Sequence, residues 1–296
     1  MLISYWGWPT KQVDTAAILK THKDDRNVML SEMLSYTQSQ TDLKGVIRFG
    51  GTIETIKRLV SAGFPVLLER GHTDPEQGWM GHYSIVTGFD DAVQSVFIPD
   101  TLLGDTTLPY DELALDWAHF DNMFLLVYPE GRQQEALSLL AEQADPAINL
   151  QFALVQVNAR LDQLQGRELF FAWFSRGSIL VQSGDYLEAS QAYDQAFAIY
   201  GQLPAGERPW RLTWYQVGPY EAYFNVGRYQ DVLTLAQQTL DNCNLDSLPE
   251  TWYWAGKAAS ALVQNAKAEE YFRAALEYYP GWPLALEGLA TLGVTP

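Results

Sequence analysis

An internal repeat in the carboxy-terminal half constrains the fold more than any other feature of the chain. Five small or aromatic residues recur 79 positions later with no gap: Trp173, Gly177, Ala189, Tyr193 and Ala196 return as Trp252, Gly256, Ala268, Phe272 and Ala275. Two periods of about 34 residues plus an insertion account for this offset. Such a period with helical spacing predicts stacked helix pairs, each burying its apolar face against the next.

The repeated residue types agree with helix packing. Gly177 and Ala189 are expected where paired helices cross closely, and Tyr193 is expected to fill the space between pairs. This half resembles tetratricopeptide repeats, with the best match from Trp173 to Ala196 and a more divergent middle copy. We predict capping helices within residues 131–170 and repeats at about 171–204, 210–244 and 250–282.

The chain changes pattern near residue 130. Before it, short helices alternate with β-rich runs at residues 66–69, 83–87, 95–98 and 123–128. Asn27 and Thr52 are placed to cap two of the helices, and the short link from Asp90 to Ser95 predicts a hairpin. We therefore predict an α+β domain with an antiparallel sheet over residues 1–129, followed by an all-α repeat domain over residues 130–296.

Composition excludes several classes of function. The 36 acidic residues against 19 Lys and Arg give a net charge of −17, and no basic run is present, so nucleic acid is not an expected partner. The single cysteine, Cys243, excludes an internal disulfide and a multi-cysteine metal site. No apolar stretch is long enough to span a membrane, and residues 1–9 show no secretion signal, so we predict no compartment.

A metal ion or cofactor is not predicted. His22, His72 and His119 have no partners at metal-ligand spacing, and no glycine-rich phosphate loop is present.

His82 and Asp100 form the most promising chemical pair. His82 begins an apolar strand, and Asp100 ends the next one after a tight turn, so an antiparallel arrangement brings them close. An acid beside an imidazole fixes its tautomer and prepares it to act as a general base. The same spacing also fits a buried core histidine and a turn aspartate. Trp79 is expected either in a substrate groove or in the core, and Tyr83 is a further groove candidate.

Several motifs before residue 130 resemble the papain-like cysteine peptidase domain of bacteriocin-processing transporters and their stand-alone relatives, the C39 type. The resemblance rests on Gly81-His82-Tyr-Ser-Ile-Val-Thr-Gly-Phe-Asp, on Ile98-Pro-Asp100 and on Tyr110-Asp-Glu-Leu before a final apolar strand. It implies that His82 is the general base and that Asp100 orients it. Relatives often act outside the cytoplasm or at its membrane, and any signal would lie upstream of this chain.

The nucleophile of that family has no counterpart in this chain. Met1-Leu-Ile-Ser-Tyr5-Trp-Gly7 resembles the end of the helix that carries the cysteine, so the expected cysteine would lie about two turns before residue 1. We expect truncation at an internal methionine, or alternatively a natural pseudoenzyme. Cys243 lies in a polar segment of the repeat half and is expected to be inert.

Three functions are consistent with the sequence. The first is a cysteine peptidase, or another papain-like acyl transferase, whose repeats recruit a peptide or protein. It applies to a full-length parent, because this chain lacks the nucleophile and is expected to be inactive. The second is a non-catalytic binding scaffold made of a pseudopeptidase and repeats. The third is a purely structural role in which the repeats cover the peptidase-like half.

Overall fold

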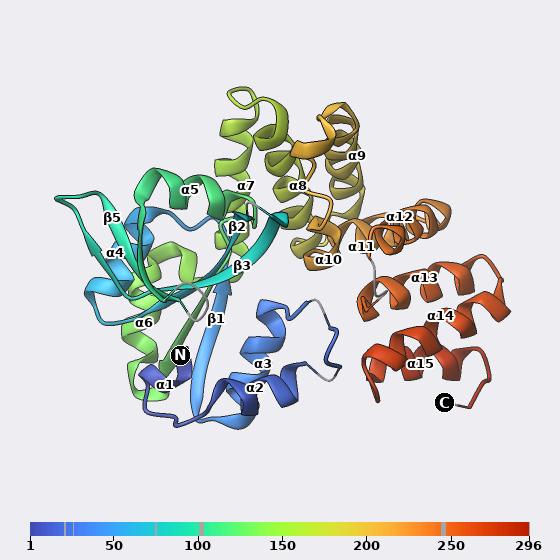
Figure 1. The fold of residues 1–296 in the computed structure, drawn as a ribbon, viewed down its shortest axis with the longest axis horizontal. Helices are drawn as coiled ribbons and strands as arrows, with labels where there is room; N and C mark the ends of the chain where they lie inside the picture. Colours follow the sequence, from blue (N-terminus) through green and yellow to red (C-terminus); the bar gives the residue numbers. More distant parts are fainter. Residues whose placement is uncertain (21, 26, 75, 101–103, 244–246, 296) are drawn as a thin grey trace.

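The structure is a computed structural model that describes residues 1–20, 22–25, 27–74, 76–100, 104–243 and 247–295 (Figure 1). Within these ranges, the residues up to 129 form two antiparallel sheets with helices, and the later residues form only helices. This confirms the predicted fold class. Residues 244 and 296, where the predicted second repeat and the repeat domain end, lie outside the described ranges.

The larger sheet has the strand order β1-β7-β2-β3 and is antiparallel throughout. Its strands are β1 (Leu43–Arg48), β7 (Phe124–Pro129), β2 (Val66–Asp74) and β3 (Gly78–Val86). One face packs on a core that includes Phe64 and Trp117, and the other packs on Leu2, Ile3 and neighbouring apolar side chains. Strand β1 was not predicted, because Lys44 and Gly45 interrupt its apolar run.

The smaller sheet has the order β4-β5-β6, formed by β4 (Gly88–Asp90), β5 (Ser95–Asp100) and β6 (Gly104–Pro109). The predicted hairpin is present, since β4 and β5 pair in antiparallel register between Asp90 and Ser95. Strand β3 leads into β4 through Thr87, whose N–H donates to Phe97 O at 3.1 Å. The hairpin thus carries the chain from the larger sheet into the smaller one.

Five helices accompany the sheets in the described part of this half: α1 (Leu2–Tyr5), α2 (Gln12–Leu19), α3 (Leu30–Gln40), α4 (Ile53–Ser61) and α5 (Tyr110–Ala118). Thr52 caps α4 as predicted, accepting a hydrogen bond from Thr55 N at 3.1 Å. The predicted cap at Asn27 is wrong: α3 begins later, and Met29 N donates to the Glu32 carboxylate at 2.8 Å. A reciprocal Glu three residues into the helix decides this start.

The repeat half consists of α6 (Gln133–Leu140), α7 (Pro146–Leu161), α8 (Gly166–Gln182), α9 (Tyr186–Gln202), α10 (Leu212–Tyr215), α11 (Gly218–Asn225), α12 (Tyr229–Asp241), α13 (Pro249–Ala261), α14 (Asn265–Tyr278) and α15 (Pro283–Thr291). A Cβ atom on Gly177 would lie 2.7 Å from the Tyr193 ring, and one on Gly256 would lie 2.7 Å from Phe272. The pairs α8–α9 and α13–α14 therefore cross at the small residues, as the repeat pattern predicted. In the described ranges, no helix has both the length and the apolar character of a transmembrane segment.

The two halves share an extensive interface. The Asn149 side chain on α7 exchanges hydrogen bonds with the backbone of Phe49, at 2.8 and 2.9 Å. Arg211 donates to Trp79 O at 2.8 Å, and His119 contacts Glu168 at 3.0 Å. The helices therefore pack directly on the sheet-containing half, as Figure 1 shows for α7, α8 and α10.

Candidate active site

The structure brings His82 and Asp100 together. His82 Nε2 lies 2.5 Å from Asp100 Oδ2, and the side chains are 18% and 2% exposed. A carboxylate accepts only, so Nε2 carries the proton it donates, and Nδ1 is the nitrogen that would accept a proton from a nucleophile. This is the arrangement of a general base held by an orienting acid.

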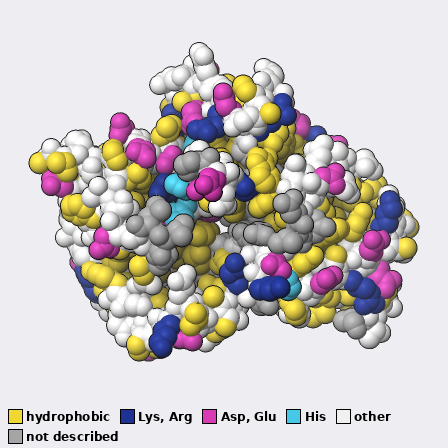
Figure 2. Space-filling model, in the orientation of Figure 1, with side chains coloured by type: hydrophobic (Ala, Val, Ile, Leu, Met, Phe, Trp, Pro, Cys, Tyr) yellow, Lys and Arg dark blue, Asp and Glu magenta, His cyan; other side chains and the backbone are white. Residues whose placement is uncertain are grey.

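The contact forms beyond the hairpin ladder. Strand β4 pairs with β5 only from Gly88↔Phe97 to Asp90↔Ser95, whereas His82 lies on β3 and Asp100 ends β5. Strand β3 belongs to the larger sheet and β5 to the smaller one, so the two strands are not paired at His82. The imidazole side chain of His82 reaches from β3 to Asp100 on β5. The histidine therefore stays partly open to solvent while the acid is buried. Figure 2 shows histidine side chains at the surface of this half, beside the hollow between the halves.

Arg70 lies opposite His82 in the β2–β3 ladder and is also fully engaged. Its Nε donates to Ser84 Oγ at 3.1 Å, and its Nη1 donates to Asp116 at 3.1 Å. Burial raises the pKa of Asp116, and the nearby His119 and Arg70 oppose that rise. Arg70 thus links β2 to Ser84 of β3 and to Asp116 of α5, next to the histidine.

Tyr83 faces the other side of the ladder. Its hydroxyl donates to Val28 O at 2.8 Å, and burial is the largest of the effects that raise its pKa well above its usual value. Its ring packs with Ile85 and other residues of the core beneath α1 and α3. Because successive residues of a strand point to opposite faces, Tyr83 and His82 do not share a groove.

Trp79 is buried in the interface between the halves and is only 5% exposed. Its ring stacks on Phe120 with centroids 5.7 Å apart and contacts Phe171 of α8 at 5.3 Å. Of the two placements considered for Trp79, the structure has the packed one. The aromatic side chain holds the repeat half against β3.

The thiol of the chain lies away from this site. Cys243 is 6% exposed and packs in an apolar cluster with Trp214, Leu240 and Leu248. Although its neighbours in the sequence are polar, Leu240 of α12 and Leu248 pack against this residue. At the amino terminus, Leu2 and Ile3 are buried against the sheet, and an apolar cavity of about 580 Å³ lies between Met1, α2, α3 and the sheet.

Comparison with known proteins gives the family of each half. Residues 1–134 match the family described as Peptidase_C39 like. The amino-terminal half is a C39-like peptidase domain. Residues 172–202 and 249–281 match the tetratricopeptide repeat family, so this domain is joined to such repeats. The C39-like domain carries His82 and Asp100 on the motifs that suggested the resemblance.

One solved structure is similar to part of the chain. A Bacillus anthracis protein named as a candidate C39-like peptidase is 16% identical, over 44% of this chain and 84% of its own, with a TM-score of 0.35. No curated protein matches the chain.

Sequence reasoning missed a second group of acidic residues, on the opposite face of the β2–β3 ladder. Glu69 is 4% exposed and Asp121 is 6% exposed, and both line a cavity between the C39-like domain and the repeats. One signal was available: Glu69 ends the apolar run Val66-Leu-Leu, where a charge is unexpected. Asp121 gave no signal, because it lies in a turn.

Proposed function

We propose that this chain is a cysteine-peptidase-like protein that binds a peptide or protein through its repeats and does not itself cleave it. The observation that carries the proposal is the formed His82–Asp100 pair together with the burial of Cys243 in a different cluster. Acyl transfer by this route requires a nucleophile within hydrogen-bond reach of the base. A base without a thiolate partner gives no acyl-enzyme.

The repeats offer a site for the recruited partner. A cavity of about 870 Å³ lies between α9, α12 and the segment that precedes α10. Aromatic and arginine side chains line it, including Tyr200, Trp210, Tyr223 and Arg208. Such residues dominate binding energy at protein interfaces, and repeat arrays bind extended peptides. We propose this cavity as the peptide site.

Peptide cleavage tests the first part of the proposal. The protein is incubated with a mixed-sequence peptide library, with and without an alkylating agent, and products are identified by mass spectrometry. We expect no cleavage above the level of His82→Ala. Cleavage that this substitution abolishes would overturn the proposed inactivity.

A transplanted thiol tests whether the pair retains the chemistry of its family. His72 lies on β2 with its ring centroid 5.9 Å from that of His82, so His72→Cys places a thiol near the imidazole. In a Cys243→Ala background, we expect alkylation at pH 6 to be about tenfold faster than in the same protein carrying His82→Ala, because a nearby imidazolium lowers a thiol pKa. Equal rates would show that His82 does not activate a thiol.

Binding to a peptide array tests the recruitment site. Trp210→Ala should weaken binding of the selected peptides at least tenfold, because it removes an aromatic anchor. Phe152→Ala, at an exposed position of α7 outside the cavity, is the matched control and should bind normally. If both variants lose binding affinity equally, or if neither loses any, this cavity is not the peptide site.

A further inference from the structure

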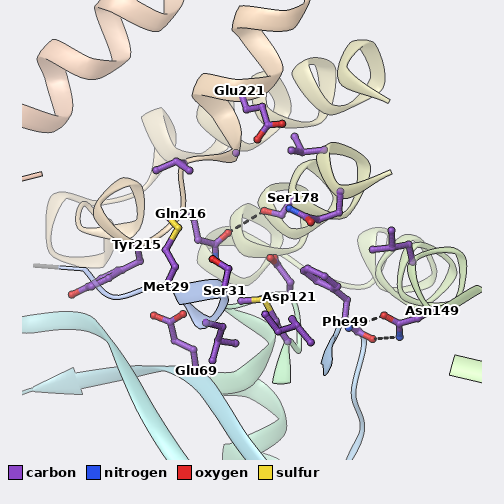
Figure 3. A pocket seen from close by; sticks show the side chains of 18 of the residues that line it. Met29, Ser31, Phe49, Glu69, Asp121, Asn149, Ser178, Tyr215, Gln216 and Glu221 are labelled. Atoms are coloured by element: carbon purple, nitrogen blue, oxygen red, sulfur yellow. Dashed lines mark hydrogen bonds between the residues drawn. The ribbon is translucent and has the colours of Figure 1, made fainter. Parts of the chain in front are cut away.

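A cavity of about 400 Å³ lies between the sheet and the repeat helices (Figure 3). It is formed by β2, by the turn between α5 and β7, by α3, and by α7, α8 and α11 of the repeat half. Its volume falls in the range of small-ligand pockets. The cavity lies on the Glu69 face of the β2–β3 ladder, whereas His82 lies on the other face, so it is separate from the candidate active site.

Three acids from distant parts of the sequence line this cavity: Glu69 of β2, Asp121 of the α5–β7 turn and Glu221 of α11. Among the described lining residues there is no Lys, Arg or His to balance them. Burial raises the pKa of Glu69 to about 8, against the opposing effect of the Tyr83 hydroxyl. Burial raises the pKa of Asp121 to about 7, against the opposing effect of the Ser175 and Ser178 hydroxyls. Because no basic residue among the described lining balances these carboxyls, a bound cation would be stabilised by their ionised forms and would favour the loss of their protons.

Asp121 provides an independent sign of an absent ligand. Its Oδ1 is buried and has no hydrogen-bond partner among the described residues. Leaving a buried polar atom unpaired costs about 1–3 kcal/mol, so natural proteins seldom do so without a function. Its backbone has a φ of +60°, which holds the side chain in a turn that Asp tolerates.

The remaining walls restrict the shape of the ligand. Apolar side chains, including Leu30, Ile47 and Val181, line much of the cavity. Ser178 and Gln216 add neutral polar groups and bond to each other at 3.0 Å. A ligand with one charged end and an apolar stem fits such a lining better than a fully polar one.

A metal ion does not fit the arrangement. Within the described residues, no three His, Cys, Asp or Glu side chains converge closely enough to hold one. Mg²⁺ and Ca²⁺ need six or more oxygens at about 2–2.6 Å, which spaced acids on an apolar wall do not supply.

We propose that this cavity binds a ligand that carries an ammonium group on an apolar stem. Glu69 and Asp121 receive the charge, and the apolar residues cover the stem. Two sources share this chemistry: a lysine side chain of a peptide and a free alkylamine. The proposal goes beyond the proposed function and does not depend on it, because no residue of the His82–Asp100 pair takes part.

Isothermal titration calorimetry tests the proposal with four probes: n-pentylamine, N-acetyl-lysine methylamide, 1-pentanol and pentanoate. We expect either amine to bind at least tenfold more tightly than the alcohol and the acid. Because a bound cation lowers carboxyl pKa values, binding at pH 7 should release about one proton, measured by repeating the titration in phosphate and in Tris. The tighter of the two amines identifies the source.

Matched variants keep the test falsifiable. Glu69→Gln and Asp121→Asn should each weaken amine binding at least tenfold, whereas Glu54→Gln, an exposed acid on α4, should not. Thermal unfolding of each variant checks that it is folded. Equal affinity for amine and alcohol, absence of proton release in the wild-type protein, or unchanged binding in both variants would overturn the proposal. None of these outcomes bears on peptide cleavage or on the array result.

Discussion

The two faces of the β2–β3 ladder differ in whether their buried charged side chains have partners of opposite charge. On one face, Arg70 bonds to Asp116, and His82 bonds to Asp100, so each charge has a partner. On the other face, Glu69 lies in an acidic cavity whose described lining contains no basic residue. The comparison shows that a two-residue period lets adjacent positions of one strand serve unrelated sites.

The same comparison separates two physical causes. A nearby opposite charge favours the ionised form of an acid, whereas burial without such a partner favours the neutral form. Asp116 experiences both effects, since burial raises its pKa and both His119 and Arg70 oppose the rise. Glu69 has only the hydroxyl of Tyr83 to oppose burial, and its pKa rises to about 8.

Loss of Trp79 should have the largest effect and should damage one face alone. Trp79→Ala removes a buried ring that stacks on Phe120 and donates to His119 Nδ1 at 3.3 Å. We expect the free energy of unfolding to fall by about 3–5 kcal/mol, measured by urea denaturation. Amine binding should weaken, since Tyr215, which lines the cavity, packs against this ring.

The face of the ladder that carries His82 shows whether the effect of Trp79→Ala is confined to the Glu69 face. The His82 imidazole resonances, followed by NMR below the unfolding transition, should stay as in the wild-type protein. Phe152→Ala, at an exposed position of α7, should lower stability by less than about 1 kcal/mol. Loss of the His82 signals together with amine binding would show that the two faces are not independent.

Glu69→Gln should change how stability depends on pH. The folded state holds a proton on Glu69 up to a pKa of about 8, whereas an unfolded Glu loses it near 4.5. The folded state thus binds more protons between these values, and its stability is full below pH 4.5 and lost as pH rises through 8. From pH 5.5 to 7.5, we expect the wild-type protein to lose about 2–3 kcal/mol relative to Glu69→Gln.

Urea denaturation at pH 5.5, 6.5 and 7.5 measures this difference. Glu54→Gln is the matched control, because that acid is exposed and should follow the wild-type protein. If the free energies of unfolding of the wild-type protein and Glu69→Gln change equally with pH across this range, Glu69 ionises normally. The two faces of the ladder would then not differ in how they treat a buried charge.

Asp121→Asn should give the smallest effect, a modest stabilisation. The amide keeps the turn conformation and removes a charge that is poorly paired when buried. We expect a stabilisation of about 1 kcal/mol at pH 7.5, measured by urea denaturation. Asp105→Asn, at an exposed position of β6, should be neutral. A destabilised Asp121→Asn would mean that the interactions of the carboxyl with Ser175 and Ser178 outweigh the cost of its buried charge.

The sequence predicted the fold class and the contact between His82 and Asp100, because both depend on local patterns. A repeat at constant offset, an apolar run bounded by turns and a short hairpin link act over tens of residues at most. The placement of Trp79 and the burial of Cys243 were less predictable. Each depends on which helix packs over the residue, and helices distant in sequence supply those contacts.

By itself, the amino-acid sequence determined that an α+β half precedes helical repeats and that a histidine and an aspartate meet at the strand pair. Periodicity and turn chemistry suffice for this, since they restrict the backbone locally. Only the tertiary structure decided that Glu69, Asp121 and Glu221 line one cavity. Their spacing along the chain carries no information about distance, because packing of the repeats on the sheet creates both the cavity and the burial that makes its acids unusual.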